Sequence, residues 1–246
     1  MNILITNDDG WGAKGILTLT RLMRQIGEVT VIAPDGPRSG QSSAISVNTP
    51  VRLKQIEPDI YICNGTPVDC IKLSVNTVFK ERKPDLIVSG INHGSNAAVN
   101  VLYSGTMGAV FTAAENGIPA IGFSLCDHSP DADFSYFEPY VLELTQKLME
   151  RKDPHGTCYN INAPIGPLKG IRITRQCKGL WQKEFQPYTD PQGNTFYLLT
   201  GSFHNNEPEA EDTDEWALAN GYIALTPTTI DMTDYTWRDL TNIGLA

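Results

Sequence analysis

The N-terminal stretch MNILITNDDGWGAKGILTLTRLMRQIGEVTVIAP, residues 1–34, decides the fold. Two short apolar runs, Asn2–Thr6 and Val29–Ala33, flank a segment, Ile16–Gln25, whose leucines recur at roughly helical spacing. Pro34 stops the second run. A strand–helix–strand unit of this kind almost always crosses over right-handed and builds a parallel sheet. The sequence therefore predicts an α/β fold.

The same alternation continues along the first half of the chain. The predicted elements are a hairpin-like arm over 43–63, a helix capped by Thr66 and running to about Phe79, a strand over Asp85–Ser89, a helix over Gly108–Asn116, a strand over Ile118–Leu125 and a helix over Phe134–Arg151. Small glycine-containing turns separate them. This order favours one sheet covered by helices.

The second half is more polar and is expected to add β-structure. Strands are predicted over 159–161, 171–174 and 222–226, an extended hairpin over 181–200 with its turn at 190–193, and short helices over 214–220 and 233–241. The acidic run 207–215 is expected to be a solvated loop. Because no linker or repeat interrupts the chain, residues 1–246 are predicted to form a single domain.

Composition excludes several classes of protein. The 246 residues carry 19 Lys and Arg against 28 Asp and Glu, a formal net charge of −9, which disfavours binding to a nucleic-acid polymer or an anionic membrane. No apolar run approaches the roughly 18 to 20 residues of a membrane span. The N-terminus lacks the basic region of a signal peptide, so a cytoplasmic location is expected. The five cysteines form no CxxC pair, which favours oxygen ligands for any metal.

Polar, glycine-containing turns follow three predicted strands. They are Asn7–Gly10, Asp35–Gly40 and Gly90–Asn96. Ligands of open parallel sheets bind outside the carboxyl ends of the strands. Because neighbouring strands lie about 4.8 Å apart, three such turns can converge on one small ligand.

Two adjacent carboxylates, Asp8 and Asp9, are the sharpest feature of these turns. At a crowded strand end they repel each other, and a cation would relieve them. Together with a Ser hydroxyl and an Asn carbonyl they form an all-oxygen set that suits Mg²⁺ or Mn²⁺ better than Ca²⁺. The alternative is that one aspartate caps the following helix or tightens the turn at Gly10.

A second signal lies in Tyr103–Ala109, where hydroxyls and glycines open a helix. Free backbone N–H groups and the helix dipole make such an end a site for an anion, most naturally phosphate. The alternative is an ordinary Ser or Thr N-cap. A metal site and an anion site together indicate phosphoryl chemistry.

Two other functions compete with this interpretation. Gly10, Gly12 and Gly15 match the G-x-G-x-x-G pattern of a dinucleotide-binding protein, and Asp35 lies at the spacing of a ribose-binding acid. The acids just before Gly10 would repel a pyrophosphate there. An Mg²⁺-binding, receiver-like regulatory module would need an acceptor Asp after a central strand, where this chain has Asn92.

Several segments together resemble the survival protein SurE family of metal-dependent nucleotidases. They are ILITNDDGWGAKGI, APDGPRSGQSSAIS, NGTPVDC, PDLIVSGINHGSN, YSGTMGA and GYIALTPTTIDMTDY, which follow one another over nearly the whole chain. The resemblance implies a Rossmann-like three-layer α/β/α sandwich with a mostly parallel sheet. It also implies an extended β-hairpin arm at about 180–200 and a C-terminal segment, about 227–246, exchanged between subunits of a homodimer or homotetramer.

The resemblance also assigns roles to residues. The metal ligands, one divalent ion per subunit, would be Asp8, Asp9, Ser39 and Asn92. The substrate phosphate would be held by Asn96, Ser104, Gly105 and Thr106. The implied reaction is hydrolysis of nucleoside 5′-monophosphates, and in some members of 3′-monophosphates or short polyphosphate. Apart from the resemblance, we expect Asp8 and Asp9 to be catalytic, with Asp9 also taking a proton from the water or giving one to the leaving ribose oxygen.

Overall fold

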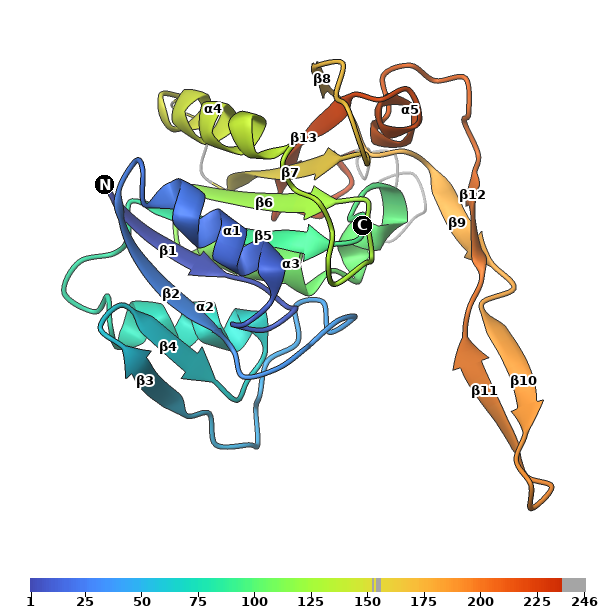
Figure 1. Cartoon of the computed structure of the whole chain (residues 1–246), viewed down its shortest axis with the longest axis horizontal. Helices are drawn as coiled ribbons and strands as arrows, with labels where there is room; N and C mark the ends of the chain where they lie inside the picture. Colours follow the sequence, from blue (N-terminus) through green and yellow to red (C-terminus); the bar gives the residue numbers. More distant parts are fainter. Residues whose placement is uncertain (152, 154–155, 236–246) are drawn as a thin grey trace, which may run out of the picture.

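The computed structural model describes residues 1–151, 153 and 156–235, and its centre is a nine-stranded sheet (Figure 1). The strands lie in the order β3 (Leu53–Glu57), β4 (Ile60–Cys63), β2 (Glu28–Pro34), β1 (Asn2–Thr6), β5 (Leu86–His93), β6 (Ala120–Leu125), β7 (Thr157–Ala163), β13 (Ile223–Thr229) and β8 (Ile171–Ile173). Neighbours run parallel except for the pairs β3–β4 and β7–β13. The predicted α/β class and mostly parallel sheet are confirmed.

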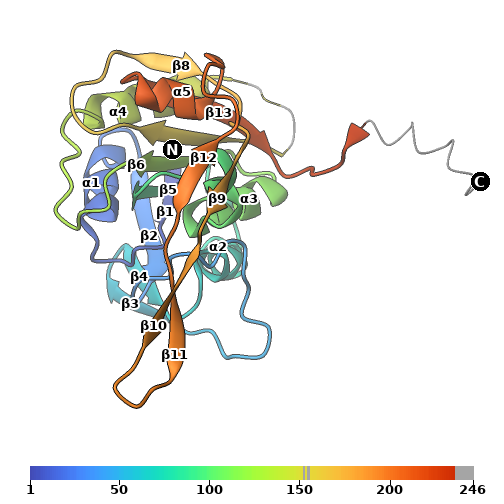
Figure 2. The same ribbon diagram turned by 90° about the vertical axis from the view of Figure 1, so that its right-hand side faces the viewer.

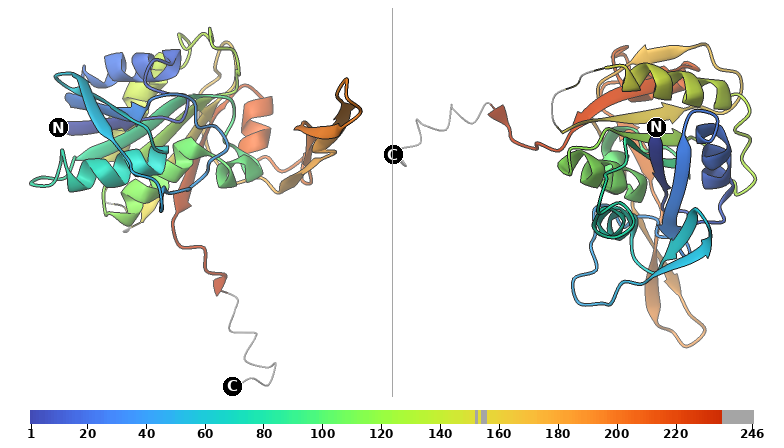
Figure 3. Two further views of the ribbon diagram at one scale, coloured as in Figure 1. Left: turned by 90° about the horizontal axis from the view of Figure 1, so that it is seen from below. Right: turned by 90° about the vertical axis from the view of Figure 1, so that its left-hand side faces the viewer.

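Helices cover both faces of the sheet. Helices α1 (Lys14–Met23) and α4 (Glu138–Met149) lie on one face, and α2 (Pro67–Asn76) and α3 (Gly105–Glu115) lie on the other (Figures 1 and 3). The alternation of side chains along a strand explains both cores. Ile3 and Ile5 of β1 pack with α1, whereas Leu4 between them packs with residues of α2 and α3. This is the predicted three-layer arrangement.

Helix α2 begins where the sequence places it. The Thr66 side chain accepts a hydrogen bond from the backbone N–H of Asp69, and the Asp69 carboxylate accepts one from the backbone N–H of Thr66. Pro67 occupies the first turn, where its missing N–H has no intrahelical partner to lose. The reciprocal cap therefore fixes the start of the helix.

Two predicted boundaries near the strand ends are wrong. The strand expected over Asp85–Ser89 continues to His93, because after a register shift beyond Ser89 the chain pairs again with β6, Asn92 opposite Ser124. Asn92 therefore lies in a strand and not in a loop. Helix α3 begins at Gly105, three residues earlier than expected, because the Ser104 side chain caps it.

The predicted hairpin forms an arm that extends from the body of the molecule (Figures 1 and 2). It consists of two antiparallel ladders, β9 (Gly179–Gln182) with β12 (Ser202–Asn205) and β10 (Phe185–Thr189) with β11 (Thr195–Leu199). The turn at its tip is closed by a 3.0 Å hydrogen bond from the Gly193 N–H to the Asp190 carbonyl oxygen. We refer to residues 179–205 as the arm.

The C-terminal part follows a short helix, α5 (Asp214–Ala219), and then β13. Because β13 is antiparallel to β7, it ends at the amino ends of the parallel strands, with Thr229 opposite Thr157. Residues 230–235 then lead away from the body (Figures 2 and 3). Most of the predicted exchange segment, 227–246, and of the helix expected over 233–241 lies outside the described residues. Among the described residues, no helix is long and apolar enough to cross a membrane.

Candidate functional site

The predicted site residues gather at the carboxyl ends of β1 and β5. Strand β1 lies between β2 and β5, so the chain leaves β1 toward one side of the sheet and later returns on the other. Such a switch of strand order opens a crevice at the carboxyl ends. Asp8 and Asp9 follow β1 directly, and Asn92 lies at the end of β5. The topology therefore places the carboxylate pair and Asn92 at one crevice.

Asp8 is the buried member of the carboxylate pair, with 4% of its surface exposed. Its Oδ1 accepts a 2.6 Å hydrogen bond from the Thr106 hydroxyl. Burial is the main cause that raises the pKa of Asp8 to about 6. The neighbouring Asp9 charge adds to this effect, and the hydrogen bonds from Thr106 and the Gly105 backbone oppose it. An unrelieved carboxylate at this place is costly, and a cation beside it would lower that cost.

The N-terminus of α3 approaches Asp8 closely. A Cβ atom added to Gly105 would lie 2.8 Å from the Asp8 Cβ and 2.9 Å from its Oδ2, so position 105 has no space for a side chain. Ser104 is the N-cap, and its Oγ accepts a 3.0 Å hydrogen bond from the Met107 N–H. The ordinary N-cap considered in the sequence is therefore present. The Ser104 hydroxyl proton is not used in that bond.

Asp9 contacts the last residue of β5. Its Oδ2 lies 3.1 Å from the ring Nδ1 of His93 and 3.3 Å from the His93 backbone nitrogen. The Asn92 side chain beside it donates a 2.8 Å hydrogen bond from Nδ2 to the Gly94 carbonyl oxygen. The carbonyl oxygen of the Asn92 amide is therefore left to act as a ligand.

The loop after β2 reaches the site through its backbone. The Arg38 N–H donates a 2.7 Å hydrogen bond to the Asp8 carbonyl oxygen, which brings the following Ser39 near the carboxylates. Ser39 itself is exposed. All three predicted turns thus come together, with Ser39 at the outside of the group.

Asn96 is held in a buried polar network. Its backbone N–H donates to Asn162 Oδ1, its carbonyl oxygen accepts from Asn160 Nδ2, and its own Nδ2 donates to Ser124 Oγ, each across 2.8 Å. Asn162 also donates to Asn160 Oδ1. Sequence reasoning missed these three partners. The signal available was two asparagines at alternate positions of strand β7, every residue of which after Thr157 is buried.

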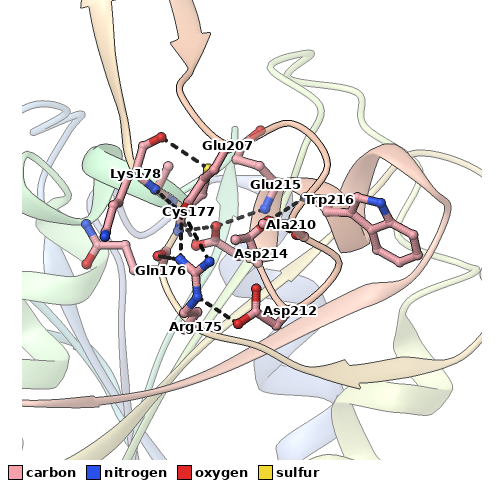
Figure 4. A network of polar contacts seen from close by, with 12 residues as sticks. Arg175, Gln176, Cys177, Lys178, Glu207, Ala210, Asp212, Asp214, Glu215 and Trp216 are labelled. Atoms are coloured by element: carbon pink, nitrogen blue, oxygen red, sulfur yellow. Dashed lines mark hydrogen bonds and ion pairs between the residues drawn. The ribbon is translucent and has the colours of Figure 1, made fainter.

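A second polar network connects the segment before the arm with the segment that follows Asn96 (Figure 4). The carboxylate of Asp214, 1% exposed, accepts hydrogen bonds from the backbone N–H groups of Ala98 and Cys177. Arg175 pairs with Glu207 and Asp212. The expectation of a solvated acidic loop over 207–215 is therefore wrong at the buried Asp214, whereas Asp212 is exposed as expected. Asp214 thus joins the segment just before the arm to the segment that follows Asn96.

The donor set suits a hard cation. No group of three or more His, Cys, Asp and Glu side chains suited to a metal occurs within the part of the chain that the structure describes. The site instead offers two carboxylates, the amide oxygen of Asn92 and, at the outside, the hydroxyl of Ser39. Oxygen donors of this kind favour Mg²⁺ or Mn²⁺ over Zn²⁺. The buried, high-pKa carboxylate of Asp8 makes a divalent cation a good fit.

A model of the family described as survival protein SurE matches residues 3–183, well over half of the chain. The chain belongs to the survival protein SurE family. The predicted resemblance is thereby confirmed, and the crevice between β1 and β5 is the candidate active site of a SurE-family chain.

Relatives within the SurE family are similar over nearly their whole length. The 5′-nucleotidase SurE of Bacteroides fragilis is 50% identical over 242 residues, which cover 96% of this chain and 94% of the relative. That of Bacteroides thetaiotaomicron is 49% identical over 245 residues, covering 98% and 94%. The crystal structure of a SurE protein from Aquifex aeolicus has a TM-score of 0.87 and 32% identity and covers 99% of both chains.

The G-x-G-x-x-G pattern has a packing explanation in this SurE-family chain. A Cβ on Gly15 would lie 1.9 Å from the Ile91 carbonyl oxygen, so the glycine lets α1 pack against β5. Around Gly12 there is open space, with nothing within 4 Å of an added Cβ. The dinucleotide-binding alternative is therefore not favoured, and the match to the SurE family disfavours the receiver-like one.

Proposed function

We propose that this chain is a divalent-metal-dependent phosphomonoesterase that hydrolyses nucleoside 5′-monophosphates to nucleoside and phosphate. The observation that carries the proposal is the buried Asp8 carboxylate beside Asp9, facing the N-terminus of α3 at the switch point of the sheet. It combines a place for a cation with a place for an anion. The name 5′-nucleotidase carried by the relatives supports this substrate class. Activity on 3′-monophosphates and short polyphosphate is part of the same proposal.

Asp8, Asp9, Ser39 and Asn92 would hold one Mg²⁺ or Mn²⁺ per subunit. The ion, when bound, supplies Lewis-acid polarisation of a phosphate oxygen and a more acidic water. The chain contributes the carboxylates and their fixed orientation. Asp9, the less buried of the two, is proposed to accept a proton from the attacking water or to return one to the leaving ribose oxygen.

The substrate phosphate would lie against Asn96, Ser104, Gly105 and Thr106. The first-turn N–H groups of α3 and the positive end of its dipole favour a phosphate at this place. The Ser104 hydroxyl proton can be donated to the phosphate, because its oxygen already serves as the N-cap acceptor. The Asn160–Asn162 network keeps Asn96 in place while charge builds on the phosphate.

We propose that the chain, a single domain, acts as a homodimer or homotetramer. Cross-strand pairing puts Phe185 with Leu199 and Pro187 with Tyr197 on one face of the arm, where these side chains are exposed. An isolated two-stranded hairpin is marginally stable in water, and a partner subunit on this face would stabilise it. Exchange of the C-terminal segment between subunits is part of the proposal.

A phosphate-release screen of nucleoside 5′- and 3′-monophosphates, with Mn²⁺, Mg²⁺ or EDTA, tests the proposed function. We expect release from 5′-monophosphates that chelation abolishes and added metal restores. The Asp8→Asn variant serves as the inactive control, since it removes one charge and keeps the shape. Unchanged hydrolysis after verified metal removal would contradict the mechanism.

A further inference from the structure

His93 lies beside the proposed metal ligands without being one of them. Its side chain is 10% exposed at the end of β5. Both its ring Nδ1, at 3.1 Å, and its backbone nitrogen, at 3.3 Å, point to the same atom, Oδ2 of Asp9. These two contacts restrict the rotation of the Asp9 carboxylate, because turning it in either direction would break at least one of the two hydrogen bonds.

The surroundings of the ring determine which nitrogen carries the hydrogen. The ring packs against Phe134 in a T-shaped arrangement, with the ring centroids 5.4 Å apart and the ring planes at 77°. Nε2 is buried and has no hydrogen-bond partner within the described part of the chain. A buried N–H without an acceptor is costly and rare in proteins. We therefore assign the hydrogen to Nδ1, which donates it to Asp9.

We propose that His93 is a positioning residue: it holds Asp9 through Oδ2 so that Oδ1 is presented to the cation. The inference rests on the proposed function, since it needs Asp9 to be a ligand. Groups that hydrogen-bond to metal-ligating side chains raise metal affinity or activity about 10- to 100-fold in other proteins, because they fix the ligand before the metal arrives. Asp8 has the corresponding partner in Thr106.

The His93 ring also has a packing role, since it fills space between α1 and Phe134. A Cβ on Gly15 would lie 3.3 Å from the His93 Cε1, so the ring is packed closely there. Two substitutions separate the roles. His93→Asn keeps an N–H donor close to the position of Nδ1 and removes the ring. His93→Phe keeps a ring against Phe134 and removes the donor.

The test measures Mn²⁺ affinity of the full chain by titration calorimetry, after removal of metal with EDTA and dialysis. We expect His93→Phe to bind Mn²⁺ about 10- to 100-fold more weakly than the wild type and His93→Asn to stay within about threefold. The melting temperature in EDTA should show the opposite order, because only His93→Asn loses the ring packing. Phosphate release by His93→Phe should recover as Mn²⁺ is raised.

The two variants also define which results would contradict the inference. Wild-type affinity in His93→Phe, or weaker binding in His93→Asn than in His93→Phe, would show that the ring acts by packing and would overturn the inference. Absence of Mn²⁺ binding by the wild type would overturn the proposed metal site, and the role of His93 with it. Failure of the inference alone therefore differs from failure of the proposed function.

Discussion

The Thr106 hydroxyl donates to Asp8 Oδ1 across 2.6 Å and joins the first turn of α3 to the turn that follows β1. Thr106 itself is fully buried. The hydroxyl favours the charged form of Asp8, against the effect of burial on its pKa. The proposed phosphate site and the proposed metal site are thus connected by one hydrogen bond.

Thr106→Val should weaken Mn²⁺ binding by about tenfold, since it removes this hydrogen bond with almost no change of shape. Thr106→Ser keeps the hydroxyl and is the matched control. Titration calorimetry of the metal-free proteins gives both affinities. Equal affinities for the Val and Ser variants would show that the hydroxyl does not prepare Asp8 for the metal.

Asp8→Asn should abolish metal-dependent phosphate release and stabilise the metal-free protein. A pKa of about 6 instead of 3.8 corresponds to a cost of about 3 kcal/mol for the charged carboxylate at neutral pH. Asn still accepts from Thr106, so removal of the charge should raise the Tm in EDTA by several degrees. Calorimetric melting in EDTA measures this. A lower Tm would indicate that the charge is already compensated without metal.

The metal-free protein should lose stability as the pH rises from about 5 to 7. Burial raises the pKa of Asp8, Asp214 and Glu215, so the folded protein holds these protons to a higher pH than the unfolded chain. The free energy of unfolding therefore falls with rising pH through this window. Acids with lowered pKa, such as Asp85 and Glu207, act in the opposite sense, and their effect fades as the pH rises above about 5. Melting curves in EDTA over this range test the slope, which should be smaller in Asp8→Asn.

Gly105→Ala should damage the site, because the new methyl group would lie 2.8 Å from the Asp8 Cβ. The carboxylate or the start of α3 must then shift, and we expect a loss of kcat/KM of at least about 100-fold. Gly12→Ala is the control in the nearby turn, where an added Cβ meets nothing within 4 Å. Phosphate-release kinetics of both variants decide the matter. Similar kinetics for Gly105→Ala and the wild type would mean that Asp8 can move without consequence.

Charges on the apolar face of the arm should reduce the size of the assembly. Tyr197→Lys combined with Leu199→Lys places two cations where the side chains are 63% and 72% exposed. Burial of these charges against a partner would be costly, so the mass in solution should fall. Light scattering after gel filtration measures it, with Gln186→Lys plus Gln192→Lys as the charge-matched control. An unchanged mass would place the interface elsewhere.

The sequence was sufficient for the core fold and for the convergence of the site. Strand β1 and helix α1 are recognisable from local sequence patterns. In a parallel sheet, the turns that follow the carboxyl ends of the strands all lie at the same edge of the sheet. Asp8 and Asp9 could therefore be placed at the crevice from their position in the chain alone. The cap of α2 was likewise predictable, because Thr66, Pro67 and Asp69 act within one turn.

What the sequence could not provide are the partners that come from distant parts of the chain. Asp214 accepts from Ala98, 116 residues away, and Asn162 from Asn96, 66 residues away. The acidic run around Asp214 and the alternating asparagines of β7 each have several explanations from local sequence. Only the packing of β7, η1 (Ala98–Leu102) and α5 against one another shows which explanation holds. The extension of β5 to His93 was missed because it follows from re-pairing with β6.

The outermost strands of the sheet have a consequence for aggregation. On one side the sheet ends in β8, only three residues long, and on the other in β3, whose pairing with β4 is irregular between Gln55 and Glu57. Short or bulged outer strands offer little continuous unpaired backbone to a second molecule. A large, mostly parallel sheet of this kind therefore offers few places for uncontrolled strand addition and fibril growth.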